Sequence, residues 1–168
     1  MKRRDLPAQV VEQLGKNGSL MKSRKLKLAM VEHPRTPRHL SLPMVRHLFT
    51  FDLMKVALTP GAPADIRIAA DEALANRLEK ISMGERLSLA HRASERIARA
   101  LLLDSETRIV RAALENPRLT EASIIKALIR RNSSSAFVEA VCRHSKWSVR
   151  REIRMALLRN EKTPLARA

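Results

Sequence analysis

The apolar residues of this chain recur at the three- and four-residue spacings of amphipathic helices, and short polar breaks separate these runs. Residues 100–132 show the pattern most clearly. One helix is predicted to end at Asp104. The next helix is predicted to have one apolar face, formed by Ile109, Val110, Ala113 and Leu114. Asn116-Pro117 ends this helix, because proline lacks an N–H and disfavours helical geometry in the residue before it.

The same criteria predict helices along the rest of the chain. Thr120 is expected to cap the next helix, with Glu121 in its first turn and Ile124, Ile125, Leu128 and Ile129 as its buried stripe. Asp5 and Ser19 are further expected caps, Gly15 and Gly18 are expected to end the first helix, and the three phenylalanines are expected in the core. The other predicted helices cover 6–14, 20–32, 41–58, 64–76, 84–103, a short segment around Phe137, Val138 and Val141, and a last helix with Val149, Ile153, Ala156 and Leu157 facing inward.

The polar breaks recur at nearly regular intervals. They begin at His33, Asn76, Asn116 and Asn160, which are 43, 40 and 44 residues apart. A branched residue followed by arginine recurs as well, at Ile66-Arg67, Val110-Arg111 and Val149-Arg150. A period of about 40 residues with helical units is typical of stacked helical repeats.

The Ala100-Leu-Leu-Leu-Asp104 segment followed by Val110-Arg111-x-Ala113 resembles the HEAT-repeat pattern, and the Asn-Pro-x-x-Thr breaks resemble HEAT-like and leucine-rich-variant repeat proteins of bacteria. The resemblance is clear in 100–132, fair in 64–99 and 145–168, and poor in 1–32. It implies an all-α, right-handed α-solenoid, with an ion pair between Arg111 and the turn residue Asp104. It implies no activity, because such solenoids serve many functions. The cluster-binding cysteine region of some leucine-rich-variant proteins is missing.

Composition supports an all-helical chain and adds a strong charge. The 168 residues include three Phe, one Trp and no Tyr, so residues that favour strands are scarce. This length predicts one domain over 1–168. The net charge of +16 lies mainly at the ends: residues 1–39 and 130–168 each hold ten basic and three acidic residues, and 40–129 hold thirteen and eleven. We therefore expect a basic N-terminal cap (1–39), central repeats (40–132) and a basic, incomplete C-terminal repeat (133–168).

Motifs for chemistry are scarce. Cys142 is the single cysteine, the five histidines are scattered, and no phosphate-binding glycine loop or nucleophile motif appears. We therefore expect no catalytic residue, metal or cofactor. A HEAT-like DNA glycosylase is a minor alternative. Base-excising chemistry needs aromatic surfaces and a positioned carboxylate, and the few phenylalanines of this chain are expected in the core. The start of the chain has no apolar run and no segment reaches a membrane span, so a cytoplasmic protein without membrane insertion is expected.

Two basic clusters are the candidate binding residues. A phosphate group near the start of the last helix would relieve the cost of placing cations at the positive end of the helix dipole. Trp147 either stacks on a sugar-phosphate surface or belongs to the core. The predicted polyanion-binding residues are Lys22, Arg24, Lys25 and Lys27 in the first cluster and Arg130, Arg131, Lys146, Trp147, Arg150, Arg151 and Arg154 in the second.

Two functions remain open at this level. A basic excess favours a module that engages nucleic-acid backbone by charge. The nearly neutral middle favours the alternative, a scaffold that binds an acidic protein. The incomplete last repeat also allows a homodimer through the C-terminal end.

Overall fold

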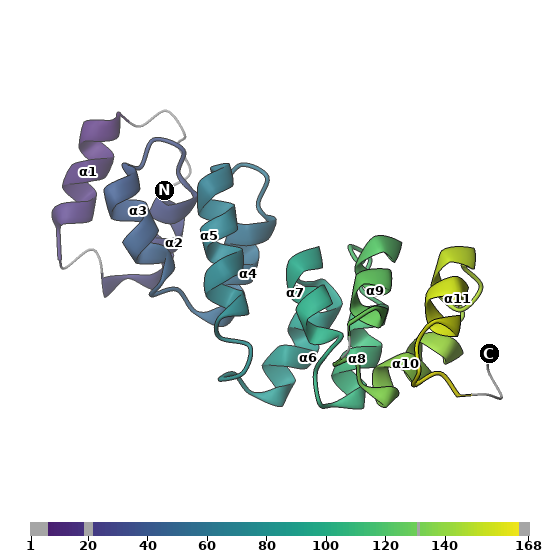
Figure 1. Ribbon diagram of the computed structural model, residues 1–168. Coiled ribbons are helices and arrows are strands. Elements are labelled where there is room, and N and C mark those ends of the chain that lie inside the picture. Colours follow the sequence, from purple (N-terminus) through teal and green to yellow (C-terminus); the bar gives the residue numbers. More distant parts are fainter. Residues whose placement is uncertain (1–6, 19–21, 131, 165–168) are drawn as a thin grey trace. The chain divides into compact units, whose positions relative to one another are not determined.

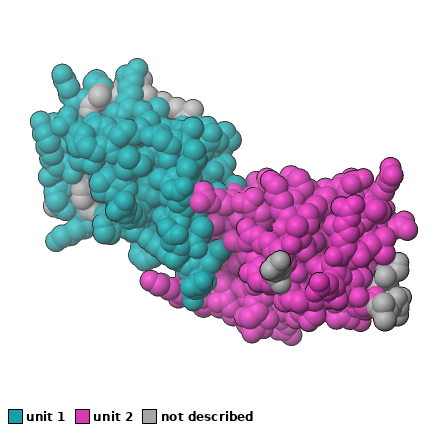
Figure 2. All heavy atoms as spheres, viewed as in Figure 1, with its two compact units in different colours: residues 1–79 teal, residues 80–168 magenta. Residues whose placement is uncertain are grey.

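The computed structural model describes residues 7–18, 22–130 and 132–164, and these form helices joined by turns, with no strand among them (Figure 1). The chain divides into two compact units, residues 1–79 and 80–168, shown in Figure 2. The single domain over 1–168 stays a prediction. The first unit contains α1 (Ala8–Lys16), α2 (Arg24–Glu32), α3 (Arg38–Val45), α4 (Thr50–Leu58) and α5 (Ala64–Ala75). The second contains α6 (Met83–Arg92), α7 (Glu95–Leu101), α8 (Thr107–Leu114), α9 (Glu121–Leu128), α10 (Ser135–Arg143) and α11 (Arg151–Leu158).

The helices of the second unit form two rows. The first helices α6, α8 and α10 pack in series, and so do the second helices α7, α9 and α11 (Figure 1). In the first unit, α2 packs on α4 and α3 on α5, so α2 and α4 are its first helices and α3 and α5 its second helices. Each unit therefore contains pairs of short helices. The core between the rows of the second unit is aliphatic, with Leu89, Ile97, Ile109 and Ile124 fully buried beside Phe137.

The repeat is shorter than the breaks in the sequence predicted. The first helices of the second unit begin at Met83, Thr107 and Ser135, which are 24 and 28 residues apart, and the second helices at Glu95, Glu121 and Arg151, 26 and 30 apart. The predicted period of about 40 residues is wrong. It rests on the distance between successive polar breaks, and each such distance contains three helices instead of the two of one helix pair. His33 and Asn116 follow first helices, whereas Asn76 and Asn160 follow second helices.

Two predicted long helices are each broken in two. The helix predicted over 41–58 is α3 and α4: Pro37 precedes the first turn of α3, Pro43 lies inside it, and an extended Phe49 precedes α4. The helix predicted over 84–103 is α6 and α7, because Ala93 is extended and the Ser94 hydroxyl caps α7 by accepting from the N–H of Ile97.

Smaller corrections concern single residues. Gly15 lies within α1 rather than after it, and Ser23, not Ser19, caps α2. Phe49 and Phe51 are exposed, and Val149 is 70% exposed instead of facing the core. Thr120 caps α9 as predicted, because its hydroxyl oxygen accepts a hydrogen bond from the N–H of Ser123. The expected cap Asp5 and residues 6 and 19 lie outside the described residues.

A polar side chain organises several of the turns that follow helices. Its acceptor atom takes the backbone N–H two residues later, which fixes the direction in which the chain leaves the helix. This hydrogen bond is made by His33 to Arg35, Asp104 to Glu106, Asn116 to Arg118, His144 to Lys146 and Asn160 to Lys162.

Two of these side chains, Asn116 and Asn160, also bond to a preceding helix end, and Arg77 makes similar bonds in the first unit. Asn116 Nδ2 donates to the carbonyls of Ala90, at 2.7 Å, and Ala93, at 3.3 Å. Asn160 Nδ2 donates to the Leu128 carbonyl at 2.7 Å. In the first unit, Arg77 donates to the Leu48 carbonyl at 2.6 Å and to the Arg46 carbonyl. The bonds of the two asparagines satisfy carbonyls at the ends of α6 and α9 that lack a partner within their own helix, and the bonds of Arg77 satisfy carbonyls in the turn after α3.

A carboxylate joins α7 to α9 in a similar way. Glu95 accepts hydrogen bonds from the hydroxyls of Thr120 and Ser123, the latter at 2.6 Å. These two bonds hold the pKa of Glu95 below its usual value of 4.5, with smaller contributions from the charges of Arg99 and Lys126.

This arrangement predicts a pH-dependent contribution to stability. Because the pKa of Glu95 is lowered in the folded state, the carboxylate stabilises the fold above its unfolded pKa and loses that contribution as the pH falls through the folded value. Glu95→Gln is expected to lower the free energy of unfolding by about 1 kcal/mol at neutral pH. Urea denaturation at several pH values measures the difference from the wild type, which should shrink steadily below pH ~4.5. A difference independent of pH would contradict this account.

Candidate functional site

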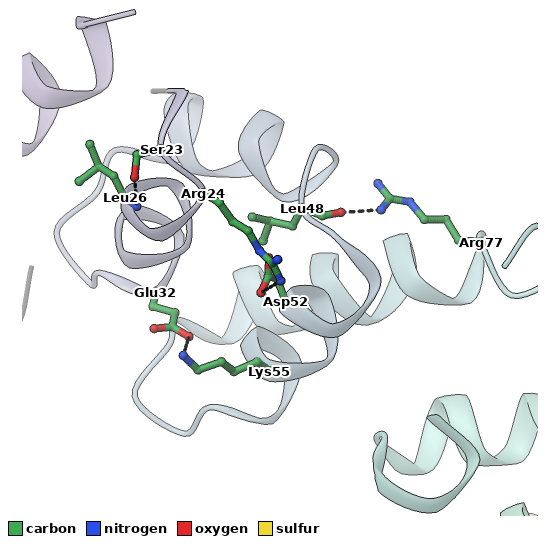
Figure 3. A network of polar contacts seen from close by, with 8 residues as sticks. All are labelled: Ser23, Arg24, Leu26, Glu32, Leu48, Asp52, Lys55 and Arg77. Carbon is green, nitrogen blue, oxygen red and sulfur yellow. Dashed lines mark hydrogen bonds and ion pairs between the residues drawn. The ribbon is translucent and has the colours of Figure 1, made fainter. Parts of the chain in front are cut away.

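The first predicted cluster lies on and before α2, and the structure uses one of its members inside the first unit. Arg24 binds Asp52 of α4 with two hydrogen bonds, from Nε at 2.7 Å and from Nη2 at 3.0 Å (Figure 3). Its guanidinium also lies over the ring of Phe49, 4.8 Å from the ring centroid. Asp52 is buried, and its hydrogen bonds and charge raise the pKa of Arg24. Arg24 therefore links α2 to α4, and its role as a phosphate contact stays a prediction.

The other three cations of this cluster do not share that role. Lys22 and Lys25 are exposed and Lys27 is half-buried. Among the described residues, no carboxylate pairs with them. A second link between α2 and α4, the ion pair of Lys55 with Glu32 at 3.9 Å, is also drawn in Figure 3. Lys22, Lys25 and Lys27 therefore stay candidates.

The second cluster is divided between several places in the second unit. Trp147 is only 2% exposed, and its Nε1 donates to the Leu114 carbonyl at 2.8 Å. Its indole belongs to the core, so stacking on a sugar-phosphate surface is wrong, and the alternative of a core residue is confirmed. Lys146 lies with its Nζ 4.1 Å from the centroid of the indole.

Two arginines near the start of α11 take different roles. Arg150 immediately precedes α11 and pairs with Glu121 of α9 at 3.4 Å. Arg151 is the first residue of the helix and is exposed. No side chain caps α11, and Glu152 lies in its first turn. A phosphate at this helix end stays a prediction.

Arg130 and Arg151 line one groove of about 810 Å³ between α9 and α11, which we call the C-terminal groove. Two cations that the sequence analysis missed, Arg159 and Lys162, line it too. Arg159 could have been found, since Arg151, Met155 and Arg159 are four residues apart and fall on one helix face. The remaining lining is mainly apolar, with two acidic residues and polar groups: Ile125, Leu128, Ile129, Ser133, Glu152, Met155, Ala156, Asn160 and Glu161.

Some of the cations in the C-terminal groove have a hydrogen-bond partner and others have none. Lys162 Nζ donates to the Ser133 carbonyl at 2.5 Å, which holds its ammonium at the edge of the groove. Arg130, Arg151 and Arg159 are exposed, and within the described part of the chain their guanidinium groups have no hydrogen-bond or ion-pair partner. Arg154 is exposed on α11 but does not line this groove. Arg131 lies outside the described residues.

A second groove, of about 1070 Å³, lies over α6, α8 and α10 of the same unit, and we call it the central groove. Arg111 lines it. The expected ion pair of Arg111 with the turn residue Asp104 is wrong, because Asp104 pairs instead with Arg86 of α6, with Nε and Oδ2 2.9 Å apart. The Arg86–Asp104 pair is largely buried and joins α6 to the turn before α8.

The described residues offer neither of two other kinds of site. No three His, Cys, Asp or Glu side chains among them lie in a metal-binding arrangement. None of the described helices combines the length and the apolar character that a membrane crossing requires.

Comparison with known proteins adds no relative: no protein-family model, no curated protein and no solved structure shows a significant match to the chain. The resemblance to HEAT-like and leucine-rich-variant repeats therefore stays a prediction. The described residues define an all-helical arrangement of paired short helices, with the C-terminal groove and the central groove on the second unit.

Proposed function

We propose that this protein is a non-enzymatic helical-repeat binding module, a right-handed α-solenoid, that engages the backbone of a nucleic acid through the C-terminal groove. Serial packing of helix pairs in each unit supports the solenoid, because each pair buries its apolar face against its neighbours. The excess of positive charge at the C-terminal end of the chain supports nucleic acid as the ligand.

The unpartnered guanidinium groups of Arg130, Arg151 and Arg159 carry this proposal. An arginine without a carboxylate partner keeps its planar set of donors available, and two of these donors match two phosphate oxygens. Three such groups and Lys162 in one groove give a concentration of positive charge that Glu152 and Glu161 only partly offset.

The recognition proposed is directed at the backbone and not at the bases. Trp147 and Phe137 are both buried, so the described part of the second unit offers no exposed phenylalanine or tryptophan ring on which a base could stack. Contacts to phosphate without stacking give no strong preference for a single strand. Lys22, Lys25 and Lys27 would add to the attraction in the first unit.

The first unit does not favour the minor alternative, a glycosylase. The exposed phenylalanine rings of this unit are Phe49 and Phe51, and the neighbouring carboxylate, Asp52, is buried and bound by Arg24. A carboxylate held in this way cannot approach a flipped-out base.

A second candidate function, a scaffold that binds an acidic protein, is favoured by the apolar part of the same groove. Ile129 is 71% exposed and Met155 is 42% exposed. Exposed apolar side chains beside arginines are typical of protein interfaces. This candidate predicts tight binding to one protein and little binding to nucleic acid at physiological salt.

Fluorescence anisotropy with a short labelled DNA duplex tests the proposal. The wild-type chain is expected to bind at ~150 mM salt, with the logarithm of the affinity falling linearly with the logarithm of the salt concentration. Neutralising Arg130, Arg151 and Arg159 together to glutamine is expected to lower the affinity and to reduce the slope by up to about 0.9 for each phosphate group that the variant no longer neutralises.

The matched control neutralises three exposed cations that line neither groove, Arg46→Gln, Lys80→Gln and Arg99→Gln. This control changes the net charge equally, so it separates a local effect from a general loss of charge. Equal slopes for the two triple variants would remove the C-terminal groove from the proposal. Binding that disappears at ~150 mM salt in the wild type would leave the protein scaffold as the working function.

A further inference from the structure

The central groove has both apolar and charged lining residues; we call the apolar part of the lining its floor and the charged part its edges. Small residues form much of this floor, because alanine on α8 and α10 leaves the space that a larger side chain would fill. Its apolar lining consists of Leu87, Ala112, Leu114, Ala136 and Ala140. The rest of the lining is polar or charged: His91, Thr107, Arg108, Arg111, Glu115, Glu139, Arg143, His144 and Ser145.

The carboxylates of this groove have basic residues beside them. Glu139 pairs with Arg143 at 2.5 Å, and Glu115 lies with Oε1 3.1 Å from Nε2 of His144, a contact that offsets the charge of Glu115 only when the imidazole is protonated. Arg108 and Arg111 are exposed, and neither has a partner among the described residues. They lie three residues apart and so share one side of α8. The unmatched charge of the central groove is therefore positive and lies along one edge.

We propose that the central groove binds an acidic amphipathic helix of a partner protein. Apolar side chains of that helix would lie on the alanine floor, and its carboxylates would meet Arg108 and Arg111. This is the mode in which a helix places one apolar stripe in a groove and is oriented by charge at the edge.

The lining favours a peptide over nucleic acid at this groove. A phosphate backbone has no apolar side chains with which to cover the half-buried Leu87, Ala136 and Ala140. An acidic amphipathic helix satisfies the floor and the arginine edge together. The proposal is independent of the ligand of the C-terminal groove.

Selection from a phage-displayed library of random peptides of about 16 residues tests the proposal on the full chain, since isolated segments of this length can become helical on binding. Enriched peptides are expected to carry apolar residues at helical spacing and an excess of Asp and Glu. Their affinities are then measured by fluorescence anisotropy. Arg108→Gln with Arg111→Gln is expected to weaken binding about tenfold. Ala140→Phe, which fills the floor, is expected to abolish measurable binding.

Two matched controls lie on the second helices. Arg99→Gln with Lys126→Gln removes the same charge, and Ala122→Phe adds the same ring to an exposed alanine of α9. Both are expected to bind the enriched peptide as the wild type does. Circular dichroism checks that each variant is folded, and Ala140→Leu replaces Ala140→Phe if the larger ring unfolds the chain.

Three results would overturn the proposal. One is enrichment of peptides that lack acidic residues or helical apolar spacing. Another is equal affinity of the groove variants and their controls. The third is competition by a DNA duplex whose binding is abolished in the same groove variants, since that would assign the central groove to nucleic acid. A failure of the duplex experiment at the C-terminal groove changes none of these readouts.

Discussion

Trp147→Ala is expected to lower the free energy of unfolding by about 3–5 kcal/mol, which is typical of removing a large ring from a core. The indole is 2% exposed, and its N–H is bonded to the Leu114 carbonyl at the end of α8. The substitution would therefore leave both a cavity and a buried carbonyl without its donor. Trp147→Phe keeps most of the volume and loses the hydrogen bond, so a smaller loss of about 1–2 kcal/mol is expected. Urea denaturation followed by circular dichroism measures both.

The control is Phe49→Ala, which removes a ring that is 62% exposed and contacts Arg24. The expected loss is below ~1 kcal/mol. Trp147 is the single tryptophan, so the emission of the chain reports on it directly. Its emission should be blue-shifted, protected from acrylamide and unchanged when DNA is added. Emission typical of water, or quenching by DNA, would return Trp147 to the binding surface.

Asn116→Ala is expected to destabilise the second unit by about 2–4 kcal/mol, because it removes a buried side chain that makes several hydrogen bonds. Its Nδ2 serves the Ala90 and Ala93 carbonyls at the end of α6, and its Oδ1 accepts the N–H of Arg118. All three backbone groups lose a partner. The change in free energy of unfolding is measured by urea denaturation.

Asn76→Ala is the matched control, since Asn76 is the same residue type and begins another of the breaks. Asn76 is exposed and follows a second helix, α5, instead of a first helix. The expected change is within ~0.5 kcal/mol. Similar losses for the two variants would mean that the two breaks are equivalent, and the helix-pair repeat would then be the wrong account of the turns.

The comparison of Asn76 with Asn116 also shows where sequence reasoning about the fold fails. Each asparagine follows an alanine- and leucine-rich helix, so the pattern predicts the same place in a repeat for both. The distinction between first and second helices depends on which helix packs on which. The spacing of the polar breaks corresponds to three helices, whereas the packing of the helices recurs after two.

The candidate binding residues show a similar division. Exposed cations on one helix face, such as Arg151 and Arg159, follow from helical spacing. The engagement of Arg24 by Asp52, of Arg150 by Glu121 and of Asp104 by Arg86 does not, because these partners are many residues apart. A basic cluster in the sequence therefore overstates the free charge on the surface.

Sequence alone establishes that the chain is helical, where several helices end, and that its excess charge is positive. These properties are local or additive: apolar periodicity, proline, capping hydroxyls and a sum of charges act without knowledge of distant residues. The length of the repeat, the burial of Trp147 and the partners of the arginines emerge from the folded arrangement of the helices. They depend on side chains that packing brings together from different helices, and no short-range pattern contains that information.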